Sequence, residues 1–271
     1  MGSLKLSVVY LLTSDPRFNL GVRGSLDDLL PRIRSIGLDG VEYNIPNPFD
    51  VDGVRLRRVT EDYGLDIPVL STGLSYILHG INLSSVDEDS RLKAVKWMYR
   101  YIDLSCELGS YRVVLGLVRG RCTDRDQGIR LLASSLRELD RYAYEKGVHI
   151  LLEPLSSGET NLVNSIEEAL MFVEMFRSIR ILFDVYHALN EEKDLVRSLG
   201  YAGRYVEHIH VADMSRGVSE LGELPLNQLF SILSSIGYEG YVSLEARMEY
   251  SVEESLRRFI DIVKALLKPL R

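Results

Sequence analysis

The chain has 271 residues, of which 46% are hydrophobic and 26% charged, and its formal net charge is -7 at pH 7. This composition is ordinary for a globular protein with one large core, and the acidic balance argues against general affinity for nucleic acid or an anionic membrane. No apolar run reaches the roughly 18 residues of a membrane helix, and the two cysteines, Cys106 and Cys122, lack metal-finger spacing. We therefore expect a cytoplasmic protein with reduced thiols.

Short apolar runs alternate with amphipathic stretches about eight times along the chain. The apolar runs have the length and composition of buried strands, and the stretches between them repeat with the period of a helix. The predicted strands are residues 4–12, 40–45, 66–72, 111–118, 148–154, 179–184, 205–212 and 240–246. The helical patterns include residues 25–37, 90–109, 128–147, 165–176 and 226–237.

Local signals mark the ends of these helices. Glycines that can end a helix in the left-handed conformation precede the next strand at Gly37, Gly64, Gly109, Gly147 and Gly237. Ser25 and Ser165 each precede an acidic residue three positions later, as in a capping box. Pro31 lies inside the first helical pattern, so we expect it to kink that helix or delay its start.

Eight βα units of about 34 residues, with almost wholly apolar strands, predict an α/β fold: a (β/α)8 TIM barrel forming a single domain over residues 1–271. An open doubly wound sheet is the alternative, but no G-x-G-x-x-G follows the first strand. In such a barrel the active site lies at the carboxyl ends of the strands. Charged residues at those ends are therefore the candidates for function.

The segment RYVEHIHVAD, residues 204–213, places two imidazoles in one predicted strand. Because the side-chain period of a strand is two, His208 and His210 should share one face while Glu207, Ile209 and Val211 point to the other. The pair could be hydrogen-bonded in a polar interior, or it could belong to a metal or catalytic site.

Three further strands end in an acidic residue: Glu153 in LLEP, Asp184 in LFD and Glu245 in SLE. Each acid alone could be a helix cap or a surface group. Together with His210, however, they come from four consecutive strands, so a closed barrel brings them to one mouth. Their mutual repulsion there would require a cation, and oxygen donors with one imidazole suit Mn²⁺, Mg²⁺ or Co²⁺.

Several segments resemble those of the xylose isomerase-like TIM-barrel sugar isomerases and epimerases, particularly the D-tagatose 3-epimerase group. The segments are LSTGLSYILHGINL, GLVRGR, LLEPLSSGETN, LFDVYHALNEE, EHIHVADMSRG and GYEGYVSLEA, and the resemblance extends from residue 5 to about 265. It implies that one divalent cation, Mn²⁺ before Mg²⁺ or Co²⁺, is held by Glu153, Asp184, His210 and Glu245. Glu153 and Glu245 would also be the catalytic acid and base.

The same resemblance assigns Glu159, His187 and Arg216 to substrate binding, and His210 rather than His208 to the metal. His208, one layer deeper in the barrel, would then have a supporting or structural role. The implied reaction is 3-epimerisation of a free ketose through a metal-stabilised enediolate, by a homodimer or homotetramer. The expected partner is a small sugar, with no nucleic acid and no membrane.

Other functions remain open from the sequence. Aldose-ketose isomerisation, hydroxyacid isomerisation and epimerisation of a phosphorylated pentulose use related chemistry, and Arg119 and Arg121 keep the phosphate option. A DNA-repair AP endonuclease uses a related barrel, but it needs histidines that the second to fourth strands lack. A barrel that binds sugar without turnover is the last alternative.

A few residues receive weaker predictions. Glu42, on an inward position of the second strand, is a candidate for a substrate or supporting role. His79 in a loop could touch substrate, and His149 begins a strand at the opposite end of the barrel, where a structural role is expected. Trp97, Tyr99 and Tyr101 share a helix, where they should serve the core or a subunit contact.

Overall fold

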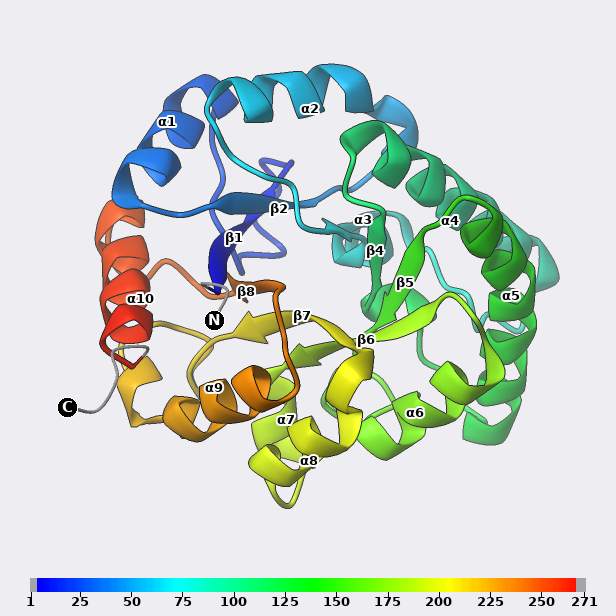
Figure 1. The fold of residues 1–271 in the computed structure, drawn as a ribbon. Coiled ribbons are helices and arrows are strands. Elements are labelled where there is room, and N and C mark those ends of the chain that lie inside the picture. Colours follow the sequence, from blue (N-terminus) through cyan, green and yellow to red (C-terminus); the bar gives the residue numbers. More distant parts are fainter. Residues whose placement is uncertain (1–3, 267–271) are drawn as a thin grey trace.

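Eight parallel strands form a closed barrel in the computed structural model, which describes residues 4–266 (Figure 1). The strands follow one another around the barrel in chain order, and β1 closes it by pairing with both β2 and β8. Their bounds are β1 Lys5–Leu11, β2 Gly40–Asn44, β3 Leu70–Ser71, β4 Arg112–Leu115, β5 His149–Leu152, β6 Ile179–Asp184, β7 Val206–Val211 and β8 Tyr241–Leu244. The predicted (β/α)8 fold is confirmed.

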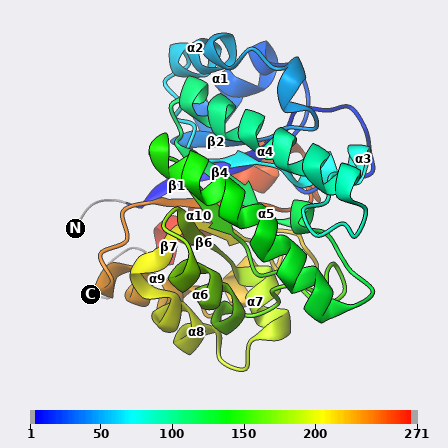
Figure 2. The same ribbon diagram turned by 90° about the vertical axis from the view of Figure 1, so that its right-hand side faces the viewer.

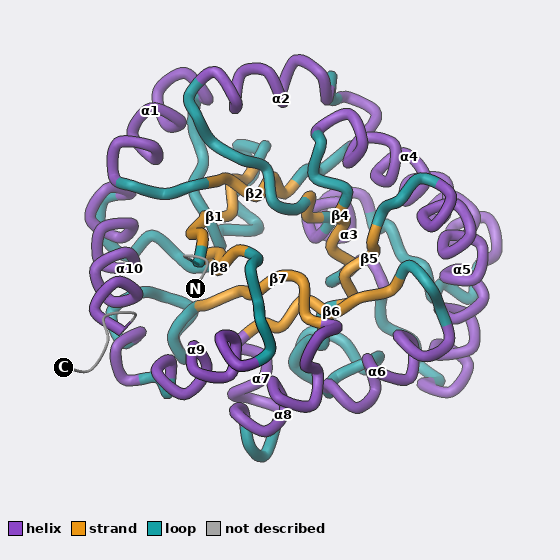
Figure 3. Tube along the Cα trace, viewed as in Figure 1, coloured by secondary structure: helices purple, strands orange, loops and turns teal. Residues whose placement is uncertain are grey.

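Helices surround the strands as an outer ring, seen from the end in Figures 1 and 3 and from the side in Figure 2. They are α1 Leu26–Ile36, α2 Gly53–Asp62, α3 Gly73–His79, α4 Glu88–Leu108, α5 Arg125–Glu145, α6 Ile166–Met175, α7 Val185–Glu191, α8 Leu195–Ala202, α9 Leu226–Ser235 and α10 Val252–Leu266. The five helical patterns named from the sequence correspond to α1, α4, α5, α6 and α9. Among residues 4–266, no helix combines the length and apolar character needed to cross a membrane.

The glycines predicted to end helices all have positive φ, for example 107° at Gly37 after α1 and 74° at Gly109 after α4. Ser165 caps α6 by accepting a hydrogen bond from the Glu168 amide. At α1 the capping-box prediction is wrong, because Ser25 makes no side-chain cap bond and the Asp28 carboxylate instead binds Arg32. The helix nevertheless begins at Leu26, so Pro31 does not delay its start.

The barrel interior has an apolar half beneath a polar mouth. Val69, just before β3, forms a small buried cluster, separate from the main core, with Val114 of β4, Leu151 of β5 and Leu182 of β6. Because alternate residues of a strand share a face, the residues two positions later point inward as well, one level nearer the carboxyl ends. On β5 and β6 those positions lead to Glu153 and Asp184.

Glu207 departs from the predicted alternation of β7. The register between β6 and β7 shifts, so that Ile181 pairs with Val206 but Leu182 pairs with His208, and Glu207 is left over as in a β-bulge. Glu207 therefore does not follow the face predicted for it, but binds Arg112 and His149 at the amino-terminal ends of β4 and β5.

Candidate active site and metal centre

Four residues at the carboxyl ends of β5 to β8 converge at the mouth of the barrel. Glu153 follows β5, Asp184 ends β6, His210 lies in β7 and Glu245 follows β8. All four are buried, and one oxygen or nitrogen of each lies within 4.8 Å of the others. These side chains could therefore hold a metal ion.

The imidazole of His210 has a nitrogen with no partner inside this cluster. Its Nδ1 is buried without a hydrogen bond. It lies 3.5 Å from Glu153 Oε1, 3.6 Å from Glu245 Oε2 and 3.8 Å from Asp184 Oδ2, which is too long for hydrogen bonds. Ligands of one ion lie about 3 to 3.5 Å apart when each is roughly 2.1 Å from the ion. The spacing and the donor types therefore fit a cation among these atoms.

Asp184 uses its two carboxylate oxygens for different purposes. Oδ1 accepts hydrogen bonds from the backbone amides of Tyr186 and His187, so Asp184 is the N-cap of α7. Oδ2 faces His210 in the cluster. The helix cap considered for this acid and the metal-binding role are thus compatible, because the cap fixes the orientation of the second oxygen.

The electrostatics of the cluster show an excess of acid. Burial raises the pKa of Asp184 to about 7 against the opposing effect of Arg216, and the Glu153 and Glu245 carboxylates act in the same direction as burial. Burial alone would lower the pKa of His210, yet the surrounding carboxylates hold that pKa well above its ordinary value. Positive charge is favoured at this position, which is what a bound cation would supply.

Glu153 fits only because a glycine faces it. A Cβ atom at Gly116, directly after β4, would lie 2.5 Å from Glu153 Oε2. Such a contact is much closer than van der Waals separation, so any side chain at position 116 would displace the Glu153 carboxylate. The glycine of the segment GLVRGR thus has a steric role in the site.

The three residues assigned to substrate also meet at this mouth. The Arg216 guanidinium binds Glu159 Oε1, lies 2.9 Å from His187 Nε2 and reaches Glu245 Oε2 at 3.5 Å. It packs 4.0 Å above the ring of Tyr186. Arg216 has a φ of 59°, a strained conformation for a residue with a side chain.

His187 has hydrogen-bond donors on both sides of its ring. The Ser156 backbone amide donates to Nδ1 at 3.0 Å, so in the neutral ring the hydrogen must lie on Nε2. Burial, reinforced by Arg216, lowers the pKa of His187 well below its ordinary value, which favours the neutral ring. Nε2 therefore presents a hydrogen toward the Arg216 guanidinium, itself only a donor. At 2.9 Å no atom fits between the two nitrogens, so an oxygen acceptor could bind both donors only if the Arg216 guanidinium moved.

The pocket over the cluster is small, with an interior volume of about 30 Å³. Sites for small molecules usually have roughly 300 Å³ or more, so a sugar would have to displace side chains such as Arg216. The pocket is also lined by residues that were not predicted, including Phe18, Asn44 and Leu117. Of these, Asn44 had a sequence signal, because it lies two residues after Glu42 on the same face of β2.

Two arginines considered for phosphate binding lie outside the pocket lining. Arg119 is fully buried and donates to backbone carbonyls, among them Leu115, Gly116 and Val163. Arg121 donates to the Gly158 carbonyl at 3.3 Å. Arg119 is thus occupied in tying the β4 loop to the loop after β5.

The remaining histidines are also away from the pocket lining. His79 ends α3 and its ring lies 5.1 Å from the ring of Trp97 on α4. His149 begins β5 and contacts Glu207 at 2.7 Å, at the end of the barrel where a structural role was expected. On α4, Tyr101 is fully buried and belongs to the main core.

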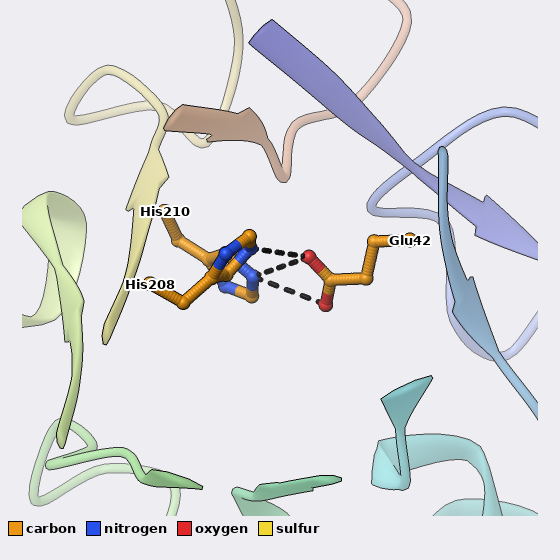
Figure 4. A group of neighbouring side chains, drawn as sticks. All are labelled: Glu42, His208 and His210. Atoms are coloured by element: carbon orange, nitrogen blue, oxygen red, sulfur yellow. Dashed lines mark hydrogen bonds and ion pairs between the residues drawn. The ribbon is translucent and has the colours of Figure 1, made fainter. Parts of the chain in front are cut away.

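Glu42 and His208 lie directly behind the cluster. Figure 4 shows the Glu42 carboxylate pointing across the barrel at the rings of both His208 and His210. Burial alone would raise the pKa of Glu42, but the two histidines hold it well below its ordinary value. His208 therefore lies next to the site but contributes no atom to the four-residue cluster.

Several known proteins are similar to this chain in sequence and in fold. The L-ribulose 3-epimerase of Mesorhizobium japonicum is 27% identical over 243 residues, which cover 87% of this chain and 80% of that protein. The ketose 3-epimerase of Arthrobacter globiformis is 26% identical and covers 91% and 84% of the two chains. A solved structure of L-ribulose 3-epimerase superposes with a TM-score of 0.83 at 22% identity, over 98% of this chain and 95% of the other.

The relatives named above are epimerases, which accords with an enzyme of the isomerase type. The profile of the xylose isomerase-like TIM barrel family matches residues 30–265, which is most of the sequence. With the closed barrel and the acid cluster at its mouth, this match shows that the chain belongs to the xylose isomerase-like TIM barrel family.

Proposed function

We propose that this protein is a divalent-metal-dependent epimerase that inverts carbon three of a free ketose. The observation that carries the proposal is the unpartnered Nδ1 of His210, buried among three carboxylate oxygens at the mouth of the barrel. The named activities of the relatives, which are ketose 3-epimerases, support the substrate class and the carbon.

Glu153, Asp184, His210 and Glu245 would hold one cation, and Mn²⁺ suits three carboxylates and one imidazole. When bound, the cation would supply a Lewis acid beside the substrate carbonyl and would stabilise negative charge that develops there. Without the cation the three carboxylates repel one another, and this repulsion favours tight binding of the cation.

The two glutamates would move protons on opposite sides of a substrate. Glu153 comes from β5 and Glu245 from β8, so that Asp184 on β6 and His210 on β7 lie between them around the barrel. One glutamate would remove the proton next to the carbonyl, and the other would return a proton to the opposite face. The carbon is thereby inverted. The proton removed by one glutamate balances the proton returned by the other, so the two carboxyl groups together carry the same number of protons before and after the reaction.

Arg216 and His187 would bind the oxygen-rich end of the sugar. Their nitrogens are 2.9 Å apart, so a carbonyl or hydroxyl oxygen could accept from both only after the Arg216 guanidinium moved away from His187. Glu159, which now binds Arg216, would orient the guanidinium or accept from a sugar hydroxyl. Because Arg119 is enclosed by backbone carbonyls, the proposal favours an unphosphorylated sugar.

Epimerisation at carbon four is a second candidate. The 3-dehydro-D-guloside 4-epimerase of Escherichia coli is 26% identical over 230 residues, which cover 80% of this chain and 85% of that protein. The same acid and base could serve that carbon if the ketone lay at carbon three of a bound glycoside. The two candidates differ in which carbon exchanges its hydrogen with solvent.

The test is a panel of free ketoses, 3-keto-glycosides and sugar phosphates incubated with Mn²⁺ in deuterium oxide and followed by NMR. Deuterium at carbon three of a free ketose, with the appearance of its epimer, is the expected result. Label at carbon four of a keto-glycoside would favour the second candidate, and label only at carbon one or two would identify an aldose-ketose isomerase. Turnover confined to phosphorylated sugars, or no exchange with any sugar, would contradict the proposal.

We further propose that the protein acts in the cytoplasm as a homodimer or homotetramer. Light scattering coupled to size-exclusion chromatography would measure the mass, and a monomer across the micromolar range would contradict that part of the proposal.

A further inference from the structure

The Glu42 carboxylate is fully buried in the middle of β2 and is held by hydrogen bonds from three side chains. His208 Nε2 lies 2.9 Å from Oε2, and His210 Nε2 lies 2.9 Å from Oε2 and 3.1 Å from Oε1. The Ser71 hydroxyl donates to Oε1. One carboxylate from β2 thus joins β3 and β7 through the interior of the barrel, and Figure 4 shows its contacts with the two histidines of β7.

These contacts determine which nitrogen of His210 faces the mouth. A carboxylate that accepts only hydrogen bonds keeps a hydrogen on His210 Nε2. The opposite nitrogen, Nδ1, is then the atom left for a ligand bond, and it is the one directed at Glu153, Asp184 and Glu245. The carboxylate also resists rotation of the ring about its Cβ–Cγ bond. Such carboxylate partners of metal-binding histidines typically raise metal affinity about 10- to 100-fold.

We propose that Glu42 is a positioning residue for His210, and that His208 and Ser71 serve to hold the Glu42 carboxylate in place. This inference rests on the proposed function in one respect, since it takes His210 to be a metal ligand. It assigns the second histidine of the segment EHIHVAD a role: His208 binds the carboxylate that orients its neighbour, and binds no cation itself.

A second metal site made of Glu42, His208 and His210 is the rival explanation, because their donor atoms also lie within 4.8 Å of one another. The separations of 2.9 Å are, however, those of N–H···O hydrogen bonds. Both imidazoles point a ring nitrogen directly at the same carboxylate, and a third donor, Ser71, occupies its other oxygen. The geometry is that of a carboxylate shared by two imidazole N–H groups.

The test compares Mn²⁺ binding to the wild-type protein and to Glu42→Gln by titration, with free Mn²⁺ measured by electron paramagnetic resonance. The wild type should bind one ion per chain. The side-chain amide of the variant has one acceptor oxygen in place of two and turns an NH₂ group toward an imidazole N–H, so Mn²⁺ affinity should fall about 10- to 100-fold. With saturating Mn²⁺, kcat should recover to within about tenfold, which separates a loss of affinity from a loss of catalysis.

Glu207→Gln is the matched control. It changes a second glutamate that also binds a histidine and is largely shielded from solvent, at the far end of the barrel from the cluster. Its Mn²⁺ affinity should stay within about twofold of the wild type, as expected for a site it does not touch. Ser71→Ala is the milder variant if Glu42→Gln fails to fold, and it should weaken Mn²⁺ binding about two- to tenfold through a less constrained carboxylate.

Unchanged Mn²⁺ affinity in folded Glu42→Gln, or in Ser71→Ala should only that variant fold, would overturn the inference. Two ions bound by the wild type and one by Glu42→Gln would also overturn it, in favour of the second metal site. These binding results do not depend on turnover. A wild type that binds one Mn²⁺ through Glu42-supported His210 but exchanges no sugar hydrogen would refute the proposed function and leave the positioning role intact.

Discussion

Charged side chains lie at both ends of the barrel, but acids and bases are balanced at only one end. At the amino-terminal end, Glu207 lies between Arg112, His149 and Arg180, at 2.9, 2.7 and 3.5 Å respectively. At the mouth, by contrast, Glu153, Asp184 and Glu245 surround the single imidazole of His210. Basic groups outnumber acids around Glu207, whereas acids outnumber basic groups around His210.

Because of this difference, we assign a role in stability to the charges at the amino-terminal end and a role in function to those at the mouth. A paired carboxylate lowers the free energy of the folded state, and its pKa falls, as it does at Glu207 despite opposing burial. Burial, reinforced by the neighbouring Glu153 and Glu245, raises the pKa of Asp184, and such a buried acid destabilises the protein unless a cation binds. Stability residues at the amino-terminal face and functional residues at the mouth are the general pattern of these barrels.

Removing the cation should produce the largest effect. Exhaustive chelation is expected to abolish turnover, and Mn²⁺ or Co²⁺ should restore it. Because the ion binds only the folded protein, a hundredfold excess over Kd adds about 2.7 kcal/mol of stability, or roughly 5–10 °C in Tm. Calorimetry and activity of the same samples provide the measurement. Full activity in metal-free protein would show that the acids at the mouth do not need a cation.

Changing either Glu153 or Glu245 to Gln should lower kcat by about 10³-fold or more with saturating Mn²⁺, because a proton-transfer group is lost. Circular dichroism should show an intact barrel. Glu207→Gln, the same chemical change at the balanced end, should leave kcat within about twofold. If all three variants lost activity equally, the two ends would not differ in the proposed way.

Arg216→Lys tests the donors that face the mouth. Lysine keeps the charge but lacks the planar fork, and it cannot bind Glu159 and substrate in the same geometry beside His187. We expect kcat/KM to fall about 10- to 100-fold, with Mn²⁺ affinity nearly unchanged. Steady-state kinetics over a range of Mn²⁺ concentrations would separate the two. A loss that extra Mn²⁺ fully reverses would reassign Arg216 to metal binding.

Glu207→Gln should have its effect on stability. The Gln side chain would leave Arg112 and Arg180 without their carboxylate partner; because the Arg112 side chain is 42% exposed and solvent screens such pairs, we expect a cost of about 0.5–1 kcal/mol in the free energy of unfolding. Urea denaturation with an unchanged m-value would measure this cost. A variant as stable as the wild type would show that the ion pairs of Glu207 make no net contribution to the free energy of unfolding.

We expect the smallest effect in the pH dependence of the stability difference between wild type and Glu207→Gln. The Glu207 pKa is lowered in the folded protein, so its stabilising contribution is full above the unfolded pKa near 4.5 and is lost as the pH falls through the folded pKa. The Tm gap between wild type and Glu207→Gln should therefore shrink as the pH falls below about 4.5. A gap that widened below that pH would have the wrong sign for a paired carboxylate.

Features that depend on local geometry were predictable from the sequence. Apolar runs indicated the eight strands, and glycines indicated the helix ends, because both are specified within a few residues. The acids at the ends of three strands followed from the fold, since parallel strands bring their carboxyl ends together. Their proximity in the structure agrees with the predicted cluster, although their catalytic roles remain predictions.

Features that depend on pairing between distant segments were not predictable. The register shift beside Ile181 redirects Glu207. Strict alternation of side chains between the two faces of a strand does not predict where one strand will contain an extra residue. β3 was predicted as residues 66–72 but spans only Leu70–Ser71, with Pro68, which has no amide hydrogen, just before it. The link from Glu42 to His210 joins residues 168 positions apart, and the pattern of either strand alone does not reveal it.

The shared carboxylate of Glu42 bears on whether this barrel could be divided. All four candidate metal ligands lie on β5 to β8 or directly after them, so a half barrel cut before β5 would keep every one of them. It would lose β2, and with it the acceptor that orients the imidazole. The first half of the chain, which contributes none of those four ligands, would thus still be required for the second half to bind its ion with full affinity.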